Sequence, residues 1–146
     1  MMNDEFKKLF LRELEKLEKE LENYSNEDLL WQAPEGINNS AGNLFLHLCG
    51  NLQHFIGAQL GGTGYERDRE FEFAGKVSIE DLKKKIHDTK TVIDEYFETV
   101  EDQSFEDEYP LQPFGYSMTV RYFLNHLLGH LNYHLGQINY HRRILS

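Results

Sequence analysis

The sequence predicts an all-α protein built as a four-helix bundle. Apolar residues recur at three- and four-residue spacings along four long segments, which is the period of an amphipathic helix. The alternating pattern of a half-buried strand is almost absent, and stretches rich in Gly, Pro and Asn separate the segments. Four helices of roughly 20 to 28 residues joined by loops are typical of a bundle.

The first two helices are predicted over residues 4–24 and 40–60. Apolar residues form one stripe of the first segment, and Lys, Glu and Arg occupy its other faces. That stripe consists of Phe6, Phe10, Leu14, Leu17 and Leu21. The second segment is apolar nearly all round, so we expect it to be largely buried. A short helical turn within 25–32 and a loop over 33–40 connect the two.

The third and fourth helices are predicted over residues 79–100 and 118–145. Ser78 is placed to cap the first of these, and Arg142 and Arg143 suit the C-terminus of the second. Both central connections are long. Residues 61–76 ("GGTGYERDREFEFAGK") are expected to form a loop, and long loops in small domains are often functional.

Composition limits the class of protein. The 146 residues suffice for one domain, 1–146, and a hydrophobic content of 40% indicates a folded chain. A net charge of −10 argues against binding to nucleic acid or to an anionic membrane surface. Cys49 is the only cysteine, so no intramolecular disulfide can form, which fits a reducing compartment. No signal peptide and no apolar run of about 20 residues is found, so a cytoplasmic protein is expected.

Histidines form a stripe on the last predicted helix. The stretch "HLLGHLNYHLGQINYH" holds four of the seven histidines, and His126, His130 and His134 are spaced at four-residue steps. At about 100° per residue, His126 and His134 lie about 40° to either side of His130, and Gln137 and His141 fall in the same sector.

Helix geometry limits how many of these histidines can bind one metal ion. Two histidines four residues apart are separated by a rise of roughly 6 Å and can chelate one ion. His126 and His134 are separated by roughly 12 Å, too far for one site with metal–nitrogen bonds of about 2.0–2.1 Å. The spacing therefore leaves two pairs open, His126 with His130 or His130 with His134.

A third ligand has to come from another helix. His47 and His54 lie seven positions apart on one face of the predicted helix 40–60, and acidic residues could also serve. His47 lies within an apolar segment, where an unpartnered imidazole would be costly. Hydrogen-bonded core histidines and a pH-sensitive polar seam are the two alternatives to a metal site.

Three segments resemble the DinB/YfiT-like superfamily of metal-dependent bundle proteins. They are "NNSAGNLFLHLCGN", "GGTGYERDREFEF" and "GHLNYHLGQI", and the resemblance covers the chain from about Trp31 onwards. It implies an up-down-down-up helix order and one divalent ion, nickel or zinc, held by three histidines with water completing the shell. Carried over to this sequence, the ligands are His47, His130 and His134.

The resemblance also suggests a chemistry. Three neutral imidazoles leave an ion with an open position, which is the pattern of a catalytic site. Such an ion lowers the pKa of bound water or of a thiol, and some members of the superfamily use low-molecular-weight thiols such as bacillithiol or mycothiol. A metal-dependent thiol S-transferase acting on a small molecule is therefore the first hypothesis, with a hydrolase as a related one.

Other residues are assigned supporting roles. His126, His54 and Gln137 are expected beside the ligand histidines without binding the ion, and His141 too far along the helix to take part. Arg67 and Arg69 are candidates for binding an anionic group of the substrate or thiol, the alternative being surface ion pairs. Cys49 points away from His47 and is expected in the core.

Two further functions compete with the enzyme. One is a non-catalytic stress-associated or binding protein with a structural or vestigial metal, whose acidic amphipathic outer helices would also suit a homodimer. The other is a helical bundle without any ion, in which the histidines are satisfied by hydrogen bonds. The sequence leaves the substrate and the metal undetermined, because one scaffold hosts several activities and imidazole binds several metals.

Overall fold

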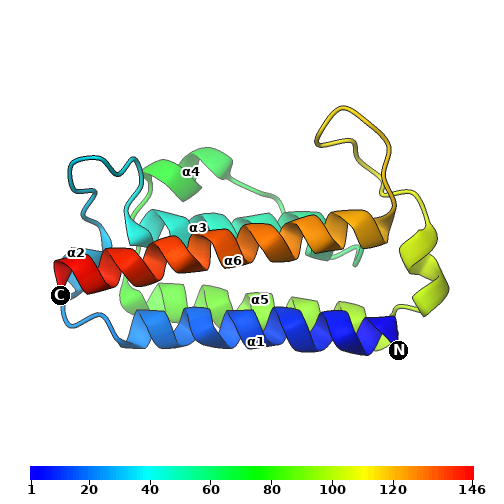
Figure 1. Cartoon of the computed structure of the whole chain (residues 1–146), viewed down its shortest axis with the longest axis horizontal. Coiled ribbons are helices and arrows are strands. Elements are labelled where there is room, and N and C mark those ends of the chain that lie inside the picture. Colours follow the sequence, from blue (N-terminus) through cyan, green and yellow to red (C-terminus); the bar gives the residue numbers. More distant parts are fainter.

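A computed structural model describes residues 1–146 and contains four long helices that lie alongside one another (Figure 1). The all-α fold is confirmed: there is no β-sheet, and a single bridge joins Glu108 to Thr119. The long helices are α1 (Met2–Glu22), α3 (Ala41–Leu52), α5 (Ile79–Thr99) and α6 (Val120–Leu145). The short elements are α2 (Glu27–Leu30), a π-helix that continues α3 (Gln53–Ala58), α4 (Arg69–Ala74) and a 3₁₀-helix (Asp102–Glu106).

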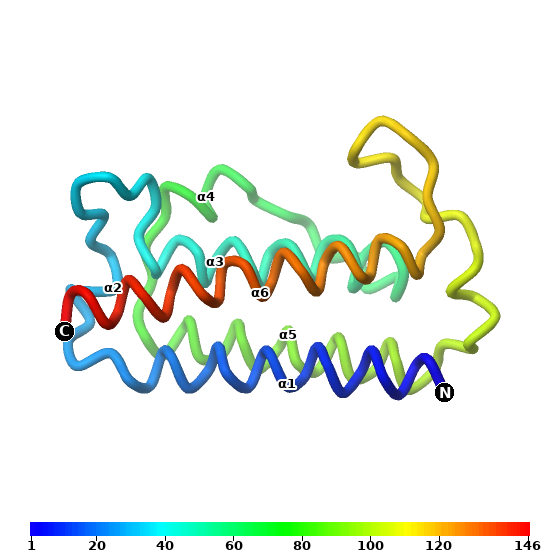
Figure 2. The backbone as a smooth tube through the Cα atoms, in the orientation of Figure 1, coloured from blue at the N-terminus to red at the C-terminus, as the bar shows by residue number.

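Each long helix packs against two others. α1 contacts α5 and α6, and α3 contacts the same two helices, so α1 and α3 lie diagonally across the bundle. Followed by colour in Figures 1 and 2, α3 and α5 run in one direction and α1 and α6 in the other. The connection between the parallel helices α3 and α5 must therefore return along the length of the bundle, which accounts for its length.

The core between the helices is apolar and rich in aromatic rings. The predicted stripe of α1 is buried as expected, with Phe10, Leu14 and Leu17 completely inaccessible to solvent. The Phe10 ring stacks on Phe97 of α5, with the ring centroids 5.7 Å apart. Each such side chain contributes about 1.5–3 kcal/mol of burial free energy, so the stripe anchors α1 on the bundle.

Side-chain caps define where the helices begin. The Ser40 and Ser78 hydroxyls each accept a hydrogen bond from the backbone N–H three residues ahead, at 3.1 Å. Thr119 does the same for the N–H of Tyr122 at 3.0 Å, so α6 begins at Val120, two residues later than predicted. Each cap satisfies a backbone donor that the first helical turn leaves unpaired.

The connection 61–76 is more ordered than expected, since part of it forms the short helix α4. The Asp68 carboxylate caps this helix by accepting from the N–H of Phe71 at 3.0 Å. The side-chain amide of Asn43 on α3 donates to the carbonyls of Glu72 and Gly75, at 3.1 and 2.9 Å. The expectation of a loop was wrong because six residues are too few to show a helical period, and contacts with α3 stabilise the helix.

No helix combines the length and the apolar content that crossing a membrane would require.

Candidate metal centre

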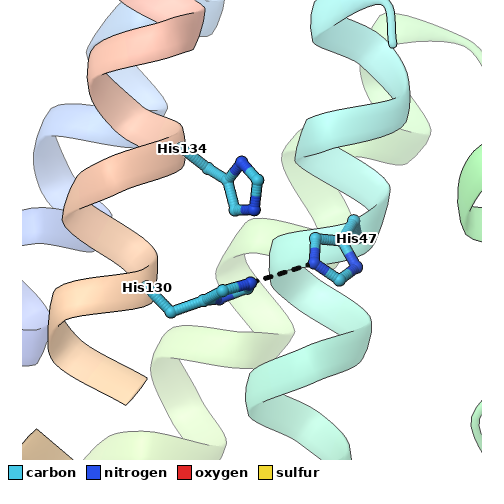
Figure 3. A group of neighbouring side chains, drawn as sticks. All are labelled: His47, His130 and His134. Carbon is cyan, nitrogen blue, oxygen red and sulfur yellow. Dashed lines mark hydrogen bonds between the residues drawn. The ribbon is translucent and has the colours of Figure 1, made fainter. Parts of the chain in front are cut away.

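Three histidines from two neighbouring helices converge between those helices. His47 lies on α3 and His130 and His134 lie on α6, and one ligand atom from each falls within 4.8 Å of the other two (Figure 3). Nε2 of His47 lies 3.1 Å from Nε2 of His130. Together these three side chains could hold a metal ion.

Helix packing brings these residues together. His130 and His134 are one turn apart on α6, and their ring centroids are 4.6 Å apart. The centroid of His47 lies 5.0 Å from that of His130 and 5.2 Å from that of His134. Since α3 packs against α6, a histidine in the apolar helix α3 meets the histidine stripe of α6.

A buried carboxylate orients His47. Nδ1 of His47 lies 3.0 Å from Oε1 of Glu72, which is on α4 and is only 4% exposed. An ionised carboxylate can only accept, so Nδ1 carries the proton and donates it. Nε2 of His47 therefore keeps its lone pair and directs it at His130 and His134. A carboxylate behind a histidine in this way also makes the histidine a stronger ligand.

Arg67 fixes the position of the Glu72 carboxylate by hydrogen bonding. Nε of Arg67 donates to Oε2 of Glu72 at 2.8 Å, and Nη2 donates to Oε1 at 2.9 Å. Burial opposes ionisation of Glu72, but the hydrogen bonds from His47 and Arg67 outweigh it and lower the pKa of the carboxyl group. The carboxylate is therefore ionised, and its charge is balanced by a guanidinium that is itself almost buried.

A glycine of α3 makes room for this carboxylate. A Cβ atom built on Gly50 would overlap Oε2 and Cδ of Glu72. Only a residue without a side chain lets the carboxylate lie against the helix at this level. Gly50 is thus a requirement for the contact between Glu72 and His47.

His134 and His130 differ in the hydrogen bonding of their Nδ1 atoms. Nδ1 of His134 donates to Oε1 of Gln137 at 2.7 Å, which leaves Nε2 of His134 free to face the other two rings (Figure 3). Nδ1 of His130 is buried and has no partner in the protein. Burial, followed by the neighbouring imidazoles, lowers the pKa of His130 to about 3, so this ring is neutral at physiological pH. A metal ligand has to be neutral imidazole.

The three side chains fit a divalent ion. With metal–nitrogen bonds of 2.0–2.1 Å, a tetrahedral ion spaces two imidazole nitrogens by about 3.3 Å. The 3.1 Å between the Nε2 atoms of His47 and His130 is close to this value. The widest separation in the group, up to 4.8 Å, is larger, so binding would draw the rings together. All three donors are imidazole nitrogens, which suit zinc, nickel, copper and iron alike.

His126 and His54, which were expected beside the ligand histidines, are not members of the three-histidine group. The ring of His126 is 6.2 Å from that of His130, packed edge-on against Phe114 at 4.6 Å. His54, in the π-helix, packs against Phe55 at 4.7 Å and makes no hydrogen bond to the three histidines. Of the two pairs that helix spacing left open, the structure brings His130 and His134, and not His126, together with His47.

The two arginines of the connection have different surroundings. Two nitrogens of Arg67 donate hydrogen bonds to Glu72, and its guanidinium carbon lies 5.7 Å from the centroid of the Phe55 ring. Arg69 is exposed, and its guanidinium lies 5.8 Å from the centroid of Phe73, whose ring contacts His47 at 4.7 Å. The expected alternative of surface ion pairs does not describe Arg67. Contact of either arginine with a substrate stays a prediction.

Two other residues belong to the core. Cys49 is buried on α3 and is not part of the histidine group, as expected. His141 is also buried. Its Nδ1 lies 2.7 Å from the Tyr24 hydroxyl and its Nε2 lies 2.7 Å from the carbonyl of Gln32. His141 therefore joins the end of α6 to the segment after α1, and both of its nitrogens are satisfied.

Sequence reasoning missed two residues of the centre, Glu72 and Gly50. Glu72 is one of 25 acidic residues, most of which are solvent-exposed, so its type alone carries no signal. Its position between Phe71 and Phe73 was the available hint, because phenylalanine side chains are often buried and this part of the connection could therefore pack on the bundle. Gly50 gave no signal, since a helical glycine can have many causes.

Comparison with known families agrees with this geometry. Residues 9–138 match the model of the DinB superfamily, which is most of the chain. The bundle fold and the three-histidine group are the features expected of that superfamily, and the chain belongs to it. Neither curated proteins nor solved structures gave a significant match.

Proposed function

We propose that this protein is a metal-dependent enzyme that activates a low-molecular-weight thiol for transfer to a small electrophile. One observation carries the proposal: three imidazoles converge, and the ligand face of His47 is set by Glu72. A site built for structure alone would be closed by a fourth protein ligand, and none lies in this group. A divalent ion held there would act as a Lewis acid that lowers the pKa of a thiol.

The residues of the chain have distinct roles in this proposal. His47, His130 and His134 would bind the ion, while Glu72 and Gln137 keep the Nδ1–H groups of His47 and His134 pointing away from it. Arg67 would keep Glu72 ionised and in place.

The proposed reaction is a nucleophilic substitution. The thiol loses its proton to solvent, its sulfur forms a bond to the electrophilic carbon, and the leaving group departs with the bonding pair. Arg69 is exposed and lies over the Phe73 ring, so its guanidinium would be available to contact an anionic group on the thiol.

The test combines metal content with turnover. Protein purified without a histidine tag is reconstituted with zinc or nickel, and bound metal is measured by elemental analysis. It is then assayed with bacillithiol or mycothiol and 1-chloro-2,4-dinitrobenzene, where the carbon–sulfur bond replaces the carbon–chlorine bond and chloride leaves. We expect about one equivalent of metal and metal-dependent loss of thiol in the wild type.

Variants give this test its controls. His130→Ala should lose both metal and turnover, whereas His87→Ala, an exposed histidine on α5, should keep both. Turnover by His130→Ala without metal would contradict the proposal. Full metal content together with no thiol consumption would favour the alternative, a binding protein whose metal is structural or vestigial.

A further inference from the structure

A groove lies directly beside the histidine group. It runs between the loop residues 36–39 and the second half of α6 and has a volume of about 420 Å³. Sites for small molecules usually measure about 300–1,000 Å³. His134 and Gln137 line the groove and also belong to the candidate metal centre. A molecule bound in the groove would therefore lie against a proposed metal ligand.

The walls of the groove hold large apolar side chains that remain accessible to solvent. Tyr133 is 66% exposed, Tyr140 64% and Ile144 68%, although all three lie on a helix that packs on the bundle. Ile37 and Leu44 complete the apolar lining. Apolar and aromatic groups gathered around a concave surface are the usual lining of a small-molecule site.

Apart from tyrosines, the titratable side chains in the lining of the groove are two histidines, His134 and His141. No Asp, Glu, Lys or Arg lines it, although 27% of the residues in the chain are charged. Asn38 and Asn39 add neutral hydrogen-bonding groups. Arg143 lies over the Tyr140 ring, 5.3 Å from its centroid, but is not part of the lining.

A second hollow, lined in part by Leu46 and Gly50 of α3, is different, because its lining also holds the charged residues Glu66, Asp68, Glu72, Lys85 and Asp88. Of the two, only the groove beside His134 suits a ligand without charge.

We infer that this groove binds an uncharged, partly aromatic small molecule. The role of this molecule as the electrophilic substrate rests on the proposed function. Its binding in the groove does not. The Tyr133 and Tyr140 rings supply the contact area, and the asparagine side chains supply hydrogen bonds. A ligand bearing a carboxylate would lose its hydration without meeting a cation in the lining.

The test uses 2-naphthol as a neutral aromatic probe and 2-naphthoate as its anionic counterpart. Binding is measured by fluorescence titration on the metal-free protein, so that no ion can attract the carboxylate. We expect 2-naphthol to bind about tenfold more tightly than 2-naphthoate. Tyr140→Ala should weaken 2-naphthol binding about tenfold, whereas Tyr122→Ala, an exposed tyrosine of α6 outside the groove, should not.

A charge-introducing variant makes the test independent of any loss of folding. Ile144→Lys puts a cation at an exposed position of the lining and should raise 2-naphthoate affinity about tenfold. Equal binding of the two probes, or equal effects of Tyr140→Ala and Tyr122→Ala, would overturn the inference.

These outcomes are separate from those for the proposed enzyme. Probe binding to a protein that takes up no metal would support the groove and contradict the enzyme. Turnover without selective probe binding would support the enzyme and contradict the groove.

Discussion

Nδ1 of His47 lies 3.0 Å from Oε1 of Glu72, a residue 25 positions further along the chain. This contact joins α3 to the short helix α4 and decides which nitrogen of His47 faces the other two histidines. Arg67 donates a hydrogen bond to the Glu72 carboxylate, and Gly50 leaves space for it beside α3. The centre is thus a set of coupled contacts, and the following predictions separate its parts.

Replacing Glu72 by Gln should weaken zinc binding about 10–100-fold, because His47 loses the anionic acceptor that strengthens it as a ligand. Competition with a chelator of known affinity measures the change. The variant also leaves Arg67 without its ionic partner, so a lower melting temperature is expected as well. Glu70→Gln, at an exposed position of the same short helix, is the matched control. Unchanged zinc affinity in folded Glu72→Gln would contradict the role of Glu72.

Gly50→Ala should reproduce the loss of zinc affinity without altering any charged or ligand residue. Its Cβ would occupy the space of the Glu72 carboxylate and push that group away from His47. Gly129→Ala on α6 is the control, since a Cβ there meets nothing within 4 Å. Alanine is the better helix former by up to about 1 kcal/mol, so the control should keep zinc and melt no lower than the wild type. Equal zinc affinities for the two alanine variants would refute this assignment.

His126→Ala should keep its metal, whereas His134→Ala should lose it. Both histidines are four residues from His130, but only His134 is within 4.8 Å of both His47 and His130. Elemental analysis of the two reconstituted variants gives the answer. Loss of metal from His126→Ala with retention by His134→Ala would mean that the other pair on α6 holds the ion.

His141→Leu should destabilise the fold by about 1–3 kcal/mol, because the buried Tyr24 hydroxyl loses the nearer of its two partners and the Gln32 carbonyl loses its donor. Chemical denaturation measures this difference in the free energy of unfolding. Zinc affinity should not change, since His141 is outside the histidine group. A stable variant with weakened zinc binding would instead place His141 in the metal centre.

Cys49 should react slowly with thiol reagents in the native protein and at once after unfolding. Burial raises the pKa of this thiol to about 11, so almost no thiolate is present at neutral pH. The folded state favours the protonated thiol, so its contribution to stability is full below the unfolded pKa of about 8.5. That contribution is lost as the pH rises from there through the folded value. Rapid labelling of the native protein at pH 8, followed with a chromogenic disulfide, would show that the site is open.

Much of the fold could be predicted from local sequence. The stripe of α1, the apolar character of α3 and the capping by Ser78 are consequences of side-chain spacing within one helix. The same spacing reduced the histidines of α6 to two candidate pairs, because helix rise limits which nitrogens can meet. The helix α4 escaped this reasoning, since its stability comes from contacts with α3 and not from a period of its own.

The sequence by itself therefore determined the class of fold, the histidine stripe and the exclusion of His126 and His134 as joint ligands. It could not determine which residue accepts a hydrogen bond from Nδ1 of His47, because that depends on how two helices and the connection between α3 and α5 pack together. Tertiary structure alone decided that Glu72 orients His47, that Arg67 is bound to Glu72, and that Gly50 provides the space. The physical reason is that helical periodicity acts over a few residues, whereas these contacts join segments brought together only by the packing of the core.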